Sequence, residues 1–140
     1  MSIVVREFNS IGEFIKSVDD ELSEMRRKLG ELLRRLEELR VKVEQERKIK
    51  SILSKLGAAA ASASTQSNVV ELKTIKLIMN PTAEQEVSAL EQVVEMLNNK
   101  ITQLQAIKKD LDVLGGMDIE VKLTAIYVDG LPKNILIRIM

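Results

Sequence analysis

The sequence predicts an α+β fold, in which a long two-helix antiparallel coiled coil carries a small β element that includes a C-terminal hairpin. Three observations predict it. Apolar residues recur at intervals of three and four over residues 11–43. A second stretch with similar spacing follows the Asn-Pro pair at 80 and 81. Apolar and polar residues then alternate after the Gly-Gly pair at 115 and 116, as is typical of β-strands.

The composition favours long helices. The chain has 140 residues, with 21 Lys and Arg against 21 Asp and Glu, so its formal net charge is zero. Aromatic residues are limited to Phe8, Phe14 and Tyr127, and leucine, isoleucine and valine must therefore supply the core. Charged and aliphatic residues in such proportions are typical of coiled coils. We expect a single extended module over residues 1–140.

The first helix is predicted over residues 10–56. Ten apolar residues alternate intervals of four and three without a break, which is a heptad repeat and indicates a left-handed supercoil; they are Ile11, Ile15, Val18, Leu22, Met25, Leu29, Leu32, Leu36, Leu39 and Val43. The β-branched residues of 2–8 predict a short strand before this helix. The small and polar residues of 57–68 predict a flexible linker after it.

The second half of the chain contains three further elements. Residues 69–79 fit either a strand or a short helix, with the strand favoured by their β-branched content. Thr82 and Gln85 have the spacing of a capping box, which begins a second helix predicted over 82–114. Residues 118–140 predict a β-hairpin, with DGLPKN as its turn. One face of the first hairpin strand is predicted to hold Ile119, Val121, Leu123, Ala125 and Tyr127.

The charges that flank the first stripe and the apolar layers it can form favour one partner over another. In a parallel homodimer Arg35 would face Arg40, and Lys42 would face Arg47, so that pairing is disfavoured. An antiparallel alignment with Val43 opposite Leu97 instead gives five apolar layers. It places Arg47 opposite Glu91, and Lys108 opposite Leu32. It also leaves residues 11–25 beyond the end of the second helix. The predicted coiled-coil interface is Leu29, Leu36, Leu39, Val43, Leu53, Val87, Leu97, Ile101, Leu104 and Leu111. Pairing within one chain and a swap between two chains both remain open.

The sequence predicts no catalytic, cofactor-binding or metal-binding residues, and therefore a protein that is not an enzyme. It contains no histidine and no cysteine, which removes the commonest general base and the commonest thiolate and imidazole ligands. The acidic pairs Asp19-Asp20 and Glu37-Glu38 are adjacent on a helix, so their members face different directions. No cofactor is expected.

The function predicted from this architecture is that of a non-enzymatic oligomeric scaffold, which presents a surface for protein–protein interaction. We expect a homo-oligomer, a dimer or higher, together with a protein partner that the sequence does not identify. Apolar residues outside the main stripes form the candidate oligomer surface, and these are Val93, Met96, Ile107, Ile135, Ile137 and Ile139. No signal peptide and no apolar stretch of bilayer length is visible, so no membrane span and a cytoplasmic location are expected.

Two alternative functions remain. Arg26, Arg27, Arg34 and Arg35 are candidate phosphate contacts of a sequence-independent nucleic-acid-binding protein, although glutamates interleave the basic residues of this helix. Two long helices with short β elements also resemble the architecture of prefoldin-type chaperones, which implies client binding. Prefoldins carry their β-hairpins between the two helices, whereas the clearest hairpin predicted here follows both.

Overall fold

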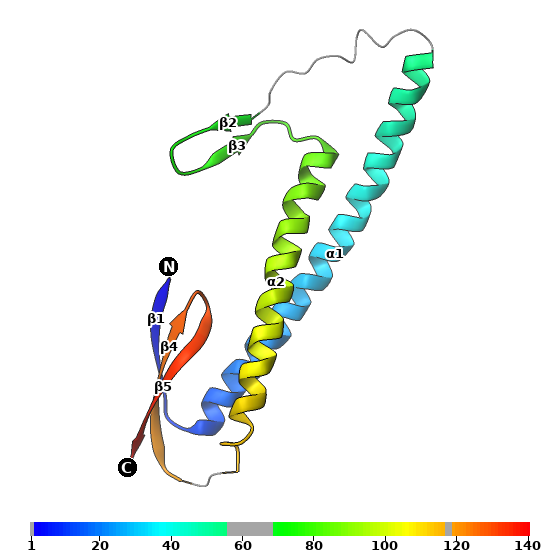
Figure 1. Ribbon diagram of the computed structural model, residues 1–140. Helices are drawn as coiled ribbons and strands as arrows, with labels where there is room; N and C mark the ends of the chain where they lie inside the picture. Colours follow the sequence, from blue (N-terminus) through cyan, green and yellow to red (C-terminus); the bar gives the residue numbers. More distant parts are fainter. Residues whose placement is uncertain (1, 56–68, 117–118) are drawn as a thin grey trace. The chain divides into compact units, whose positions relative to one another are not determined.

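The computed structural model describes residues 2–55, 69–116 and 119–140, without the side chain of Leu53. The fold is α+β, with two helices that pack together and a small antiparallel sheet containing a C-terminal hairpin, as predicted (Figure 1). Its elements are β1 (Ile3–Phe8), α1 (Ile11–Lys55), β2 (Val69–Glu71), β3 (Lys76–Ile78), α2 (Ala83–Leu111), β4 (Val121–Val128) and β5 (Leu131–Ile139). The linker predicted over 57–68 lies outside the described residues.

The chain divides into two compact units, which are described separately. The sheet unit comprises Met1–Gly30 and Glu95–Met140, and contains β1, β4 and β5 with the adjoining parts of both helices. The hairpin unit comprises Glu31–Val94, and contains β2 and β3 with the remaining parts of both helices.

The sheet unit is built on a three-stranded antiparallel sheet in the order β1-β4-β5. β1 supplies the third strand that the predicted hairpin needs, because two strands alone are marginal in water. The turn between β4 and β5 has only two residues, Asp129 and Gly130, with φ angles of 53° and 84°. Positive φ at both positions matches a type I′ turn, which an Asp-Gly pair favours. The predicted six-residue turn is therefore too long: the residues after Gly130 already belong to β5, with a register shift at Ile126/Tyr127.

One face of β4 forms the centre of the sheet unit's core. Val121, Leu123, Ala125 and Tyr127 are all buried, as their alternation predicted, whereas Ile119 precedes the strand and is exposed. They pack in one cluster with residues of β1, α1, α2 and β5, which are Phe8, Ile11, Phe14, Val18, Leu22, Ile101, Leu104, Leu111 and Leu131. The rings of Phe8 and Phe14 lie 5.1 Å apart, so two of the three aromatic residues meet in this core.

Side-chain caps define the starts of both helices. The backbone N–H of Glu13 donates to Ser10 Oγ at 3.0 Å, which caps α1. The predicted capping box of α2 is confirmed: Gln85 N–H donates to Thr82 Oγ1 at 3.1 Å, and Thr82 N–H donates to Gln85 Oε1 at 3.0 Å. Beyond Leu111 the chain continues in turns rather than helix, so α2 ends three residues before the predicted limit.

Residues 69–79 form strands, as favoured, but two short strands rather than one. β2 and β3 pair antiparallel over three residues each, and Leu72 N–H donates to the carbonyl oxygen of Ile75 at 2.9 Å across the turn. A second hairpin therefore lies between the two helices in the chain, in addition to the C-terminal one.

The predicted axial alignment of the helices is wrong by about ten residues. In the hairpin unit Val43 shares a hollow with Val87 rather than facing Leu97, and Arg47 pairs with Glu84 rather than Glu91. The alignment was predicted wrongly because residues 87, 90, 94 and 97 all lie on one apolar stripe. Sliding one helix by about three turns therefore keeps apolar faces together.

The sheet unit shows the same displacement. Lys108 forms an ion pair with Asp19 rather than lying over Leu32. A Cβ on Gly115 would lie 3.7 Å from Ile15 Cδ1, so the end of the α2 segment reaches the first turns of α1. Residues 11–25 are therefore not left beyond the second helix, as the predicted alignment had it.

Candidate interaction surfaces

Nine of the ten residues predicted to form the coiled-coil interface are buried or half-buried in one of the two units. In the hairpin unit Leu36, Leu39 and Val43 are buried, and Val87 is half-buried. The sheet unit contains five others: Ile101, Leu104 and Leu111 are buried, and Leu29 and Leu97 are half-buried against its core. The side chain of Leu53 lies outside the described part of the structure.

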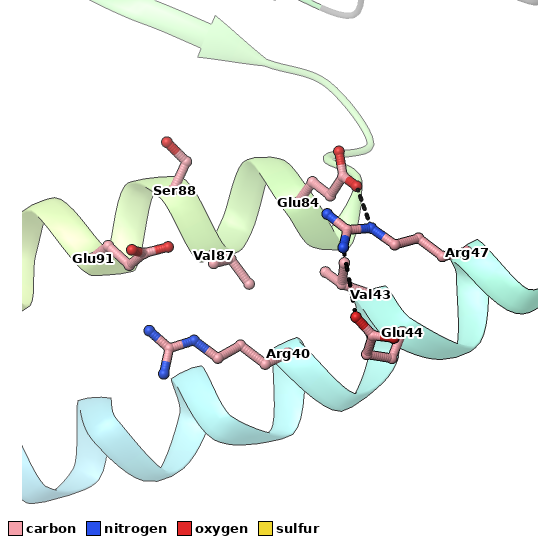
Figure 2. Close-up of a pocket in the computed structure, with 8 residues that line it drawn as sticks. All are labelled: Arg40, Val43, Glu44, Arg47, Glu84, Val87, Ser88 and Glu91. Atoms are coloured by element: carbon pink, nitrogen blue, oxygen red, sulfur yellow. Dashed lines mark hydrogen bonds and ion pairs between the residues drawn. The ribbon is translucent and has the colours of Figure 1, made fainter.

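A hollow of about 450 Å³ lies between the helices of the hairpin unit (Figure 2). The short side chains of Val43 and Val87 point toward one another across it. Arg47 closes one end, with Nε 3.5 Å from Glu84 Oε1 and Nη1 3.5 Å from Glu44 Oε1. Arg40 extends along α1 at the other end, where its guanidinium group lies on the side of Glu91. The full lining is Arg40, Val43, Glu44, Arg47, Glu84, Val87, Ser88 and Glu91.

The charges around this hollow nearly cancel. Two guanidinium groups face three carboxylates, and the pair that joins the two helices is well exposed at both ends. Exposed ion pairs contribute only about 0.2–1 kcal/mol each. The ion pair between Arg47 and Glu84 therefore helps to align the two helices, and the hollow concentrates no charge of one sign.

Half of the candidate phosphate-binding arginines have carboxylate partners. Arg27 is paired with Glu24, and Arg35 lies 3.6 Å from Glu38 and 3.8 Å from Glu86. Arg26 and Arg34 are exposed. The basic residues of α1 thus belong to a mixed-charge exterior.

The β2–β3 hairpin exposes an aliphatic surface that the sequence analysis missed. Six large apolar side chains between residues 70 and 79 are each at least 38% exposed, and these are Val70, Leu72, Ile75, Leu77, Ile78 and Met79. The sequence analysis treated residues 69–79 as one element, either a strand or a short helix, and did not predict a turn within them. The polar pair Lys73-Thr74 between two apolar runs is the signal that could have revealed the turn.

The two edge strands of the three-stranded sheet expose further aliphatic side chains. On β1, Ile3, Val4 and Val5 are each about half exposed or more. On β5, Ile137 and Ile139 are exposed, whereas Ile135 is half-buried against the core.

The candidate oligomer surface on α2 is divided. Val93 and Met96 are 45% and 62% exposed. Ile107 instead packs against the core of the sheet unit, which leaves less of it available for a partner.

A small polar cluster lies at the border of the sheet unit's core. The guanidinium carbon of Arg6 lies 5.3 Å from the Phe8 ring centre and 5.6 Å from that of Tyr127, both within cation–π range. The Tyr127 hydroxyl is buried and makes no hydrogen bond of normal geometry to any described residue. Burial raises the pKa of Tyr127, and the nearby Arg6 charge and Ser17 hydroxyl only partly oppose this. Burial likewise raises the pKa of Glu21, against the weaker attraction of Arg6 and Lys100.

Neither a metal centre nor a membrane span is found among the described residues. Residues 2–55, 69–116 and 119–140 contain no group of three or more carboxylates placed to hold a metal ion. Over the same ranges, neither helix is apolar enough along its length to cross a bilayer.

No model of a known protein family matches the chain, and comparisons with curated proteins and with solved structures found no similar protein. The surfaces described above are therefore the basis of the functional proposal.

Proposed function

We propose that the chain is a non-enzymatic assembly protein, which forms a dimer or higher oligomer in the cytoplasm and presents an aliphatic surface to protein partners. The observation that carries this proposal is the β2–β3 hairpin, where six large apolar side chains are exposed on two strands of three residues each and on the residues next to them. A two-stranded hairpin is marginal in water without a surface to pack on. Contiguous exposed apolar patches mark interaction sites in soluble proteins.

The mass of the purified chain in solution tests this proposal. We expect size-exclusion chromatography with light scattering to give at least twice the monomer mass at micromolar concentration. Replacing Leu72 and Ile75 with serine tests the contribution of the hairpin and should lower the affinity for a protein partner. Val113→Ser is the matched control, because Val113 is 81% exposed and lies outside the hairpin. A monomer at every concentration would contradict the proposal.

A client-binding chaperone of the prefoldin-like type is the second candidate. The observation that favours it is the position of the β2–β3 hairpin, between the two helices in the chain and with exposed aliphatic side chains. We expect such a protein to suppress the turbidity of a denatured enzyme diluted into buffer. Leu72→Ser/Ile75→Ser should weaken this suppression, and Val113→Ser should leave it unchanged.

Nucleic-acid binding is tested on the same samples. Because Arg27 and Arg35 already have carboxylate partners, we expect no binding when the chain is titrated with DNA or RNA at low salt. Binding that weakens steeply with added salt would instead favour the nucleic-acid alternative.

A further inference from the structure

The direction of the backbone groups on β5 identifies which residues are free to bind a partner. Met140 N–H donates to the carbonyl oxygen of Glu120 at 3.1 Å, next to the last residue pair of β4 and β5. In an antiparallel pair, residues alternate between bonding the neighbouring strand and pointing away from it. The backbone groups of Ile135, Ile137 and Ile139 therefore point to the free edge of the sheet.

The side chains of the same three residues lie on the face of the sheet that forms the core of the sheet unit. They lie opposite the buried residues of β4, in the pairs Ala125–Ile135, Leu123–Ile137 and Val121–Ile139. Their exposure rises along the strand, from half-buried at Ile135 to 44% at Ile137 and 76% at Ile139. An apolar layer thus reaches the edge of the sheet and remains open to solvent there.

Protection of this edge is limited to the first part of β5. Prolines, lysines and bulges commonly prevent edge strands from pairing with other chains. β5 has Pro132 and Lys133 next to its register shift, but from Ile135 to Ile139 its only charged residue is Arg138. Arg138 belongs to the opposite face, where its Nη1 donates to Thr124 Oγ1 at 3.0 Å.

We propose that β5 pairs with β5 of a second copy of this chain, antiparallel and about a two-fold axis at Ile137. This inference rests on the proposed oligomeric function and specifies its contact. Ile137 then faces Ile137 of the second copy, and Ile135 faces Ile139, so the three outward-pointing residues from Ile135 to Ile139 are used on both strands. β-branched pairs across strands are favourable. On the other face Leu136 meets Arg138 of the second copy, so no like charges are opposed.

The other free edge is less suited to pairing with itself. Asp129 N–H donates to the carbonyl oxygen of Ser2 at 2.8 Å, so the outward residues of β1 are Ile3, Val5 and Glu7. A two-fold axis at Val5 would oppose the carboxylate of Glu7 to the side chain of Ile3. Pairing of β1 with β5 of another copy would leave free edges at both ends and give an open-ended chain.

Single cysteines test this register directly, because the natural chain has no cysteine. Directly opposed residues that exchange backbone hydrogen bonds have Cα atoms about 5.5 Å apart, within the range of a disulfide. Full-length Ile137→Cys should therefore give a covalent dimer on mild oxidation, as seen by non-reducing electrophoresis. Ile135→Cys is the matched control: its two copies would lie roughly 13 Å apart and should not cross-link. The double variant Ile135→Cys/Ile139→Cys should cross-link again.

Proline substitution provides an independent measurement. Ile137→Pro removes an N–H that points away from β4, so the hairpin keeps its internal hydrogen bonds. We expect the oligomer mass to fall to that of a monomer with the circular dichroism spectrum unchanged, whereas Val5→Pro should keep the wild-type mass. Cross-linking of Ile135→Cys alone, or an oligomer in which Ile137→Cys never cross-links, would overturn the β5 proposal while leaving the assembly function intact. A wild-type monomer at all concentrations would overturn both.

Discussion

The two units bury their aliphatic side chains to different extents. In the sheet unit, Phe14, Val18, Leu104 and Leu123 are at most 1% exposed, within a cluster that draws on a sheet and both helices. The hairpin unit buries Leu36, Leu39, Val43 and Ala83, yet every residue of 71–80 is exposed. Two helices in contact cover only one stripe of each other, whereas a sheet adds a second surface that closes a core. Aliphatic residues thus stabilise the sheet unit internally, whereas many aliphatic side chains of the hairpin unit are exposed to solvent.

The largest expected effect comes from Phe14→Ala in the sheet unit. Removing a fully buried phenylalanine typically costs about 3–5 kcal/mol, from lost burial and the remaining cavity. The free energy of unfolding should fall by that amount in urea, whether it is followed by far-ultraviolet circular dichroism or by Tyr127 fluorescence. Tyr127 is the only tyrosine of a chain without tryptophan, and it is buried in the same core.

Leu39→Ala is the matched variant in the hairpin unit, because Leu39 is also 1% exposed. We expect its circular dichroism transition to move to lower urea by more than its Tyr127 fluorescence transition does. Equal shifts of the two transitions would show that both units unfold together, and would contradict the contrast between a closed core and an open one.

Local features could be predicted from the sequence because neighbouring residues determine them. Alternation along β4 indicated its buried face, and the spacing of Thr82 and Gln85 indicated the cap of α2. The axial alignment of the helices could not be predicted in the same way. Apolar residues recur along the whole of each stripe, so many alignments give apolar layers, and contacts distant in sequence, such as Asp19–Lys108, accompany the observed one.

The β2–β3 hairpin was missed for a related reason. Its strands have only three residues each, which is too short for alternation to distinguish one element from two. The aliphatic surface of this hairpin, on which the proposed function depends, therefore became visible only in the structure. The apolar face of β5 was predictable, but its position at the edge of the sheet depends on pairing with β4 and β1.

A smaller effect on the free energy of unfolding is expected at alkaline pH, where the titration of Tyr127 shows how well the core of the sheet unit excludes water. Burial raises the pKa of Tyr127 above its ordinary value of 10.0, so the folded state retains the proton longer than the unfolded state. The stability that this provides is complete below pH 10 and is lost as pH rises through the folded-state pKa. We expect the tyrosinate absorbance to appear above pH 10 in the folded chain.

Tyr127→Phe completes this test. Since the hydroxyl is buried without a hydrogen bond to a described residue, its removal should change the free energy of unfolding at neutral pH by no more than about 1 kcal/mol. The variant should also lose part of the alkaline decrease in stability. Titration of the folded chain at the ordinary tyrosine pKa would instead show that this side of the core is open to water.

The smallest expected effect is a change in the free energy of unfolding that has opposite signs for two glutamates, Glu21 and Glu24, three positions apart on α1. Burial raises the pKa of Glu21 above 4.5, so its ionised form is disfavoured by folding, and its contribution to stability is lost as pH rises through the folded-state pKa. Glu21→Gln should therefore increase the free energy of unfolding at pH 7, by less than about 0.5 kcal/mol.

Glu24 is the matched control with the opposite sign, because its hydrogen bond from Arg27 lowers its pKa and favours the ionised form. Glu24→Gln should slightly reduce stability at pH 7, and this difference from wild type should disappear as pH falls below the folded-state pKa of Glu24. If urea unfolding at pH 7 showed the same sign for both variants, Glu21 would be as well solvated as Glu24, and the sheet unit would be less closed on this side than its buried core indicates.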